Sequence, residues 1–461
     1  MAEHTMIMEA TLRKLLDEKK YATLREILVT MNPSDIAVIF DELEIDRLPL
    51  LYRLLPKELA ADVFVEMDPD AQELLIRGFS DAELKEVLDE MFIDDAVDVI
   101  EEMPATVVRR ILEQAAPEMR KSINDILRYP ENSAGSIMTT EYVALKPEMT
   151  VAEAITRIRR TGIDKETIYT CYVIKDRLLI GVVTVKDLLL CDNDDTKIEQ
   201  VMITHVISVN THDDQEEVAQ MFSKYNFMAL PVVDAENRLV GIITFDDAMD
   251  VMQDEATEDI EKMAAIIPSE KPYLTMTPFE IWKNRIPWLM LLMVSATFTG
   301  LIISHFEIAL QRLVVLTAFI PMLMDTAGNS GSQASVTVIR GLSLNELEFK
   351  DILSIIWKEA RVAVLCGLSL AAACFLKIFL VDDLILGSFV GVSSPFLVIG
   401  VICITLSITV LFAKLVGCTL PLFAQKLGFD PAVMASPFIT TIVDALSLLV
   451  YFSVASIFLH L

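Results

Sequence analysis

Residues 430–444 read DPAVMASPFITTIVD and open the last long apolar stretch of the chain. Asp444 at the end of this motif and Asp325 further upstream are the two carboxylates that sit well inside the apolar segments. A carboxylate in hydrocarbon is costly, so it marks an ion or substrate pathway by default. Thr440 lies one helical turn before Asp444 and shares its face. The alternative is an aspartate that is hydrogen-bonded to hydroxyl groups of a neighbouring helix.

A lone carboxylate in lipid would take up a proton and become neutral. If two chains meet on a two-fold axis, two copies of Asp444 converge and repel each other until a divalent cation lies between them. Pro437, seven residues earlier, is expected to loosen the helix and free nearby carbonyl groups.

Five segments are long and apolar enough to cross a membrane as helices of about 20 residues. Lys and Arg residues near their ends fall mostly on one side, which predicts a cytosolic N-terminus and an outside C-terminus. We therefore expect a multi-pass protein of the plasma (inner) membrane. The expected spans are 286–304, 313–341, 360–381, 394–420 and 437–460.

The second of these segments is unusually polar, because residues 321–333 read PMLMDTAGNSGSQ. Polar backbone at membrane depth is tolerated only against protein or a water-filled cavity. One interpretation is a pore wall, to which Asn329 and Gln333 offer amide oxygens four residues apart. The other is a polar loop between two shorter segments.

Net charge divides the chain in two. Residues 1–280 hold 57 acidic and 28 basic side chains, whereas residues 281–461 hold 10 of each. An acidic body repels phosphates, which argues against nucleic acid and favours cations as partners. The six cysteines show no metal-ligand spacing and are expected to be reduced.

Residues 1–130 predict an all-α, superhelical domain of short helices, each punctuated by proline. Asp94, Asp98 and Glu101 lie on one face of one of these helices. Such a run is either a solvated surface or part of a cation site.

Residues 131–250 contain a repeat, because Gly181-Val-Val-Thr184-Val-Lys-Asp187 recurs as Gly241-Ile-Ile-Thr244-Phe-Asp-Asp247 sixty positions later. Each copy follows an apolar strand and precedes a helix. The pattern resembles a tandem pair of CBS domains, an α/β fold in which this motif usually meets a nucleotide.

Residues 245–280 connect the repeat to the first span and begin with an acidic helical stretch, FDDAMDVMQDEATEDIEKM. Like charges at i,i+4 destabilise a helix by about 0.2–0.5 kcal/mol per pair. The helix therefore packs against a neighbour only if cations neutralise it, and hard divalent cations suit its oxygen ligands. The alternative is a solvated linker helix.

Taken together, the motifs PxLxxxxGNxGxQ and DPAxxxxPFxTTxxD, the CBS pair and the acidic helix make the chain similar to the MgtE family of magnesium channels and transporters. The resemblance implies a homodimer with a central pore of five helices per chain, in which Asp444 holds hydrated Mg²⁺. It also implies that cytosolic Mg²⁺ closes the pore by binding between the N-domain, the CBS pair and the connecting (plug) helix. The matching positions are Asp94, Asp98, Asp214, Glu216, Asp247, Asp250, Glu255, Glu258, Asp259 and Asp430, and the pore-lining ones are Asn329, Gln333 and Thr440.

Some members of that family bind ATP in the CBS pair, which would place ATP near Tyr169, Lys186, Asp187 and Phe227. The chain departs from the family pattern at three positions. Asn226 stands where an acidic residue would add a sensor ligand, Ala327 replaces a glycine, and Ser447 replaces a glycine after Asp444.

Two other functions stay open at this point. The first is transport of another divalent cation, such as Co²⁺, Mn²⁺ or Ca²⁺. The second is a non-conducting membrane sensor whose CBS pair reads a nucleotide. An enzyme is not expected, because no nucleophile–base pair or phosphate-cradling glycine loop is present.

Overall fold

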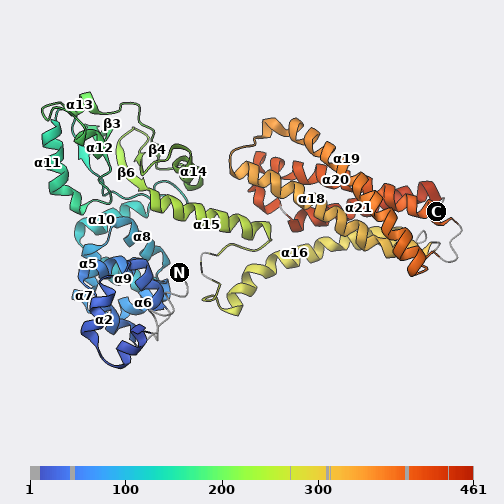
Figure 1. Ribbon diagram of the computed structural model, residues 1–461, viewed down its shortest axis with the longest axis horizontal. Helices are drawn as coiled ribbons and strands as arrows, with labels where there is room; N and C mark the ends of the chain where they lie inside the picture. Colours follow the sequence, from blue (N-terminus) through green and yellow to red (C-terminus); the bar gives the residue numbers. More distant parts are fainter. Residues whose placement is uncertain are drawn as a thin grey trace. The chain divides into compact units, whose positions relative to one another are not determined.

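The computed structural model describes residues 11–41, 47–269, 271, 273–307, 311, 313–389, 394–434 and 436–459. The chain divides into two compact units, Met1–Met252 and Gln253–Leu461, and the boundary falls inside helix α15, Phe245–Met263. Figure 1 shows the helices and strands of both units.

The first part of unit 1 is all-α, as the sequence predicts. Most of its short amphipathic helices begin at or next to a proline, and α7 begins at Ser80, which forms a capping box with Glu83. Leucine, isoleucine and phenylalanine side chains fill its core. The helices are α2 Tyr21–Leu28, α3 Pro33–Asp41, α4 Leu48–Tyr52, α5 Lys57–Val65, α6 Pro69–Gly78, α7 Asp81–Glu90, α8 Ile93–Glu102, α9 Ala105–Gln114 and α10 Pro117–Ile126.

The rest of unit 1 is the predicted repeat of two small sheets. In each sheet a short first strand pairs in parallel with the second, which pairs antiparallel with the third. The first repeat comprises β1 Ala144–Leu145, α11 Val151–Thr161, β2 Thr170–Lys175, β3 Leu178–Thr184 and α12 Val185–Leu189. After α13 Ile198–Val201, the second comprises β4 Val209–Asn210, α14 Gln215–Tyr225, β5 Ala229–Val233, β6 Leu239–Thr244 and α15.

The glycine of each repeat motif is required by a close approach of the other half of the pair. A Cβ added at Gly241 would lie 2.7 Å from the Met138 sulfur, and one at Gly181 would lie 2.6 Å from the Met202 sulfur. The two repeats are therefore interlocked rather than merely adjacent.

The helical part and the second repeat share one apolar core. Phe40 and Ile100 belong to the same buried cluster as Phe222, Ile243 and Ala248. Apolar contact therefore holds these two parts together independently of any charge.

Unit 2 is helical throughout its described part. Four of its described helical stretches are long and apolar enough to span a membrane: Pro278–His305, Phe349–Ile385, Pro395–Lys426 and Pro431–Leu459. The individual helices are α16 Pro278–His305, α18 Ile320–Ser343, α19 Ile352–Lys377, α20 Pro395–Lys426 and α21 Ser436–Leu459, with a 3₁₀ segment at Val314–Phe319 and a π-helical segment at Ile378–Ile385.

The polar second segment forms the continuous helix α18, so the alternative of a loop between two shorter segments is wrong. Glycines allow this helix to pack closely. A Cβ at Gly417 of α20 would lie 2.2 Å from the Gly331 carbonyl oxygen, and one at Gly328 would lie 3.0 Å from Thr440 Cγ2 of α21. The backbone of α18 therefore touches α20 directly.

The helix that contains the expected third span is longer than that span, because α19 already begins at Ile352. One expectation about the last span is wrong. Pro437 lies at the beginning of α21, where its missing N–H is harmless, so it starts the helix rather than loosening it. Residue 460, the expected end of the last span, lies outside the described residues.

Candidate functional site

Helix α8 carries two of the predicted ion ligands, Asp94 and Asp98, on the side that faces helix α15. Asp94 is 8 % exposed, because α8 buries its apolar face and Asp94 lies in its first turn. Asp247 of α15 lies close enough to raise the pKa of both aspartates. The fold therefore brings together three of the residues that the sequence singled out.

Asp247 also caps its own helix. The Thr244 hydroxyl donates to Asp247 Oδ2 at 2.5 Å, and in the first repeat the Thr184 hydroxyl donates to Asp187 Oδ2 at 2.6 Å. The Thr-x-x-Asp repeat is thus a helix-capping device in both copies. The copy at Asp247 additionally faces α8.

Burial dominates the electrostatics around Asp247. It raises the pKa of Asp247 to about 6, with the neighbouring Asp246 adding repulsion. Burial and the charge of Asp247 raise the pKa of Asp95 and of Asp98 to about 7 and that of Asp94 well above its usual range. Burial and neighbouring carboxylates dominate these shifts, and within the described residues none of the four aspartates forms an ion pair with Lys, Arg or His. No paired cation therefore relieves the repulsion among them.

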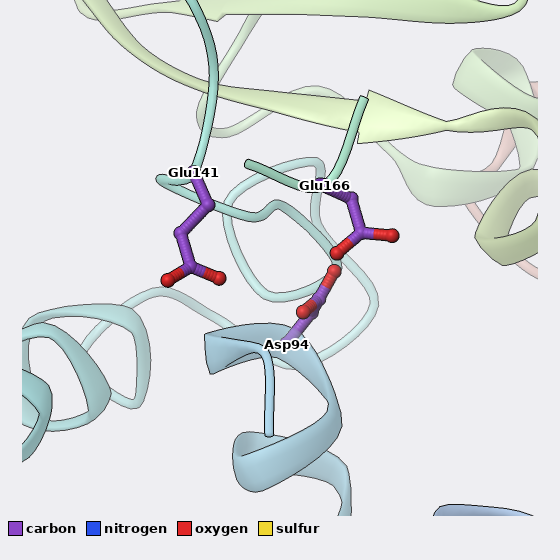
Figure 2. Close-up of side chains that lie close together, drawn as sticks. All are labelled: Asp94, Glu141 and Glu166. Carbon is purple, nitrogen blue, oxygen red and sulfur yellow. The ribbon is translucent and has the colours of Figure 1, made fainter. Parts of the chain in front are cut away.

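The sequence analysis missed two glutamates of the first repeat, Glu141 and Glu166. Figure 2 shows both side chains directed toward Asp94, and the three residues offer carboxylate oxygens within 4.8 Å of one another. The Glu166 N–H donates to the Glu141 carbonyl at 3.0 Å, which holds the two segments together. Both residues come from irregular backbone without periodicity, so no spacing in the sequence could have identified them.

The surroundings of Glu141 favour a negative charge, whereas those of Glu166 oppose one. Glu141 Oε2 accepts from the Ile93 N–H at the start of α8 at 3.3 Å, which suits the positive end of a helix dipole. Glu166 has one buried oxygen that finds no hydrogen-bond partner in the described part of the chain. Burial and the charge of Asp95 raise its pKa to about 8.

Further acidic side chains surround this centre. Asp62 and Glu66 at the end of α5 interact with Asp95, and Glu66 also interacts with Asp250 of α15. Together these side chains form the carboxylate cluster, which comprises Asp62, Glu66, Asp94, Asp95, Asp98, Glu141, Glu166, Asp246, Asp247 and Asp250.

Two predicted ligands have local roles in helix α14. Asp214 is its N-cap and accepts from the Glu216 N–H at 2.9 Å. Glu216 accepts from Gln220 at 3.3 Å. Asn226 ends the same helix with φ = 55°, a left-handed conformation that asparagine tolerates better than most residues. Their assignment to an ion site stays a prediction.

The C-terminal half of α15 contacts other parts of unit 2. Asp259 Oδ2 accepts from the Ser343 hydroxyl of α18 at 3.0 Å. Glu258 and Asp430 are both paired with Lys262, at 2.5 and 2.6 Å. Glu255 lies half-buried one turn before Asp259. Lys262 therefore lies between two of the predicted ion ligands, Glu258 and Asp430.

Inside the apolar helices, Asp444 and Asp325 lie near enough to interact electrostatically. Asp444 Oδ1 is buried and has no hydrogen-bond partner among the described residues. Ser447, one turn later, is also buried, with an unpartnered hydroxyl in the described structure.

Helix α18 presents an exposed polar stripe. Asp325, Asn329 and Gln333 follow one another at intervals of four residues and are all exposed, whereas Ala327 and Gly331 on the other side are buried. Glutamine, asparagine and aspartate on one face are unsuited to lipid.

A buried ion pair escaped the sequence analysis. Lys414 of α20 is 4 % exposed, and its Nζ lies 3.9 Å from Glu359 Oε2 of α19. Only the packing of α19 on α20 reveals this pair, because the sequence places the two residues 55 positions apart.

Of the predicted ATP residues, Tyr169 and Lys186 lie at adjoining backbone, because the Val185 N–H donates to the Tyr169 carbonyl at 3.0 Å. Tyr169 is 66 % exposed. Asp187 is occupied by the capping box, and Phe227 stacks on Tyr225 in the second repeat. Nucleotide binding therefore stays a prediction.

Four segments of the chain match three known protein families. Residues 31–132 match the MgtE intracellular N domain, residues 134–193 and 198–254 match CBS domains, and residues 320–454 match MgtE, a family described as divalent cation transporter. A protein of Thermus thermophilus named magnesium transporter MgtE is 35 % identical over 98 % of this chain and 99 % of its own length.

The chain belongs to the MgtE family. A second member, the magnesium transporter MgtE of Bacillus subtilis, is 33 % identical over 97 % of the chain and 96 % of its own length. The names of these MgtE relatives describe transport, which agrees with the expectation of a non-enzymatic protein.

Solved structures confirm the predicted fold of the MgtE cytosolic region. The cytosolic domain of the Mg²⁺ channel MgtE in complex with ATP matches with a TM-score of 0.50 and 37 % identity, over 53 % of this chain and 99 % of that chain. The soluble part of a magnesium transporter matches with a TM-score of 0.51 and 31 % identity, over 55 % of this chain and 99 % of that chain. The α-helical N-domain followed by a CBS pair is thereby confirmed.

Proposed function

We propose that this protein is a homodimeric Mg²⁺ channel or transporter of the plasma membrane that cytosolic Mg²⁺ closes. The observation that carries the proposal is the set of polar side chains within the apolar helices: the stripe on α18 and the carboxylate of Asp444. An anchor for a sensor needs no polar stripe, whereas an ion pathway does.

The stripe of Asp325, Asn329 and Gln333 requires a wet or polar neighbour. A second copy of the chain, related by a two-fold axis, would supply one, because the same face of each α18 would then line a shared water-filled path. The dimer therefore accounts for both the exposure and the polarity of this face.

Asp444 is the proposed ion-holding residue. Its buried, unpartnered oxygen and the nearby Asp325 make a strongly negative point that a divalent cation would neutralise. Mg²⁺ sheds its water reluctantly and takes oxygen ligands, which suits two carboxylates and the amide oxygens of the stripe.

The carboxylate cluster is the proposed cytosolic sensor. The shared apolar core holds the N-domain against the second repeat, and the uncompensated carboxylates oppose that contact. Mg²⁺ would reverse the balance, because its charge joins oxygens that otherwise repel. Moving a gate from mostly open to mostly shut takes about 5.5 kcal/mol of differential binding, so several ions would act together.

The proposed topology places the N-terminus in the cytosol and the C-terminus outside. Five membrane helices per chain follow from the four apolar helices and α18, whose close packing on α20 through Gly331 and Gly417 places it inside the helix bundle. The excess of Lys and Arg at one set of helix ends supports this orientation.

The proposal includes ATP binding in the CBS pair, and its support is the fold of a relative. The MgtE relative whose cytosolic domain was solved with ATP shares the fold of this region. Equilibrium dialysis of the protein with ATP, repeated on Lys186→Ala, tests it; equal retention of ATP by both would remove Lys186 from the nucleotide site.

Flux into proteoliposomes tests the pore. We expect Asp444→Asn to reduce Mg²⁺ uptake at least tenfold, because the neutral side chain loses the charge that holds the ion. Asp383→Asn, a change at a half-buried carboxylate in the π-helical segment, is the matched control and should leave uptake intact.

The same assay separates the alternatives. Uptake of Mn²⁺ or Co²⁺ that excess Mg²⁺ does not inhibit would favour another cargo. Absence of flux for every divalent cation in a folded protein would leave a non-conducting sensor. Undiminished Mg²⁺ uptake by Asp444→Asn would exclude this residue from the pathway.

A further inference from the structure

Lys262, near the C-terminal end of α15, bridges two carboxylates. Its ammonium group lies 2.5 Å from Glu258 Oε1, one turn earlier on the same helix, and 2.6 Å from Asp430 Oδ2, on the segment before α21. All three side chains are at most 35 % exposed. Lys262 is the one basic residue in a helix that otherwise carries only acidic charge.

Asp430 has a partner for each of its carboxylate oxygens. Its Oδ1 accepts from the Ala432 N–H at 2.8 Å, while Oδ2 faces the ammonium group of Lys262. The Ala432 contact lies within the segment before α21 and orients the carboxylate. The ion pair with Lys262 is the contact of Asp430 that joins this segment to α15.

Neighbouring contacts fasten the same end of the helix. Met263 packs against Ile339 of α18 and Ala432, and Asp259 accepts from Ser343. Ala265, with φ = 56°, ends the helix just after the contact. The lysine thus sits in a built interface rather than on a free surface.

The positive charge of Lys262 affects how a metal ion could bind to Glu258 and Asp430. Glu258 and Asp430 would repel each other across the interface if Lys262 were absent. With the ammonium group between them, the pair is held by one resident positive charge. A divalent cation that is to bind both carboxylates must first displace that charge, because an ammonium group and a metal ion repel at this distance.

We propose that Lys262 is a built-in cation that fastens the C-terminal end of α15 to the Asp430 segment in the absence of metal, and that it competes with divalent cations for Glu258 and Asp430. Its regulatory meaning rests on the proposed function, since only a gated pore gives the position of α15 an effect on transport. In that setting Lys262 is a positioning residue that raises the Mg²⁺ concentration needed at this end of the helix.

Hydrogen exchange of the full-length protein in detergent tests the proposal, read by mass spectrometry on peptides from residues 253–269 and 428–434. In EDTA the wild-type segments should be protected. Lys262→Gln keeps most of the side-chain length but removes the charge. We expect it to increase exchange in EDTA about tenfold, the equivalent of about 1.4 kcal/mol, and Mg²⁺ to restore protection because the two carboxylates are free to share an ion.

Three further variants sharpen the result. Lys262→Arg keeps the charge and should protect the segments in EDTA. Asp430→Asn keeps the acceptor for Ala432 but removes one carboxylate, so it should increase exchange and Mg²⁺ should fail to restore protection. Lys271→Gln, which removes an exposed ion pair with Glu280, is the matched control and should change nothing in these peptides.

Unchanged exchange of Lys262→Gln in EDTA would overturn the fastening role. Increased exchange that Mg²⁺ cannot reverse would overturn the competition. Neither outcome depends on flux, so the pore proposal at Asp444 can fail or survive separately.

Discussion

The two ends of helix α15 meet acidic partners in different ways. At its start, Asp246, Asp247 and Asp250 belong to a carboxylate cluster whose pKa shifts have no basic cause within the described residues. Near its end, Glu258 and Asp430 share the ammonium group of Lys262. Among the residues that the structure describes, the acidic side chains at the start of α15 form no ion pair with a basic side chain, whereas those near its end share Lys262.

A high density of acidic side chains is therefore not enough to define a metal sensor. The energy that a bound cation can contribute depends on how much repulsion the metal-free protein leaves unrelieved. The start of α15 leaves the pKa of its neighbours Asp95 and Asp98 raised to about 7, so a divalent ion acts strongly there. The end of α15 is already neutralised in part, so the response to Mg²⁺ is expected to be weaker and to need higher concentrations.

The largest expected effect is loss of Mg²⁺ stabilisation at the start of α15. Saturating Mg²⁺ at about 100 times its dissociation constant stabilises one site by about 2.7 kcal/mol. Asp94→Asn combined with Asp98→Asn should remove most of this gain and increase metal-free stability, because like charges are deleted. Thermal unfolding of the full-length protein across a Mg²⁺ titration measures both changes.

Asp89→Asn, on the exposed face of the neighbouring helix α7, is the control for this pair. It should respond to Mg²⁺ as the wild type does. If the double variant kept the full Mg²⁺ response, the cluster would not be the place where the ion acts, and the contrast between the two ends would collapse.

A pH effect of intermediate size should mark the same end. The docked carboxylates have pKa values of about 6 to 8, above the usual range near 4, so the docked form binds extra protons. Without Mg²⁺, stability is therefore fully present below about pH 4 and is lost as the pH rises through 6 to 8. We expect about 1–2 kcal/mol between pH 6 and 8 after allowance for solvent screening.

Thermal unfolding in EDTA at a series of pH values checks this sign. Saturating Mg²⁺ should flatten the profile, because bound cations keep the carboxylates ionised. Asp247→Asn should reduce the slope in EDTA, since Asp247 is the shared neighbour of Asp94, Asp95 and Asp98. A profile that rises with pH in EDTA would contradict the assignment of unrelieved repulsion to this cluster.

The smallest expected effect lies at the end of α15. Ser343→Ala removes one hydrogen bond to Asp259, worth about 1 kcal/mol. Exchange of the peptide 253–269 should increase only a few-fold, both in EDTA and in Mg²⁺. Increased exchange of this peptide in Mg²⁺ but not in EDTA would mean that Ser343 assists ion binding. That result would contradict the difference between the two ends of α15.

Periodic features were predictable from the sequence. The helices of the N-domain, the two repeats and the apolar helices follow from spacings of 3.6 and 2 residues and from the Thr-x-x-Asp repeat. Asp94, Asp98 and Asp247 were identified because helical spacing or a repeat marked them. Their proximity was expected only from the family resemblance, because no spacing in the sequence shows that α8 packs near the start of α15.

Residues outside periodic segments were missed. Glu141 and Glu166 stand on irregular backbone, and a backbone hydrogen bond between them brings both to α8. The sequence of α15 includes Lys262, but the stretch was interpreted as uniformly acidic. Lys414 and Glu359 became partners only through helix packing. In each case the information lies in contacts between distant segments.

The two Thr-x-x-Asp motifs differ in what a single substitution would change. Asp187 accepts from Thr184 at the start of α12, and asparagine or serine can fill that capping role. Asp247 accepts from Thr244 and also carries charge toward α8. A neutral polar residue at position 247 would therefore keep the start of α15 but remove the charge that acts on α8, so helix capping and electrostatic coupling can be separated at one position.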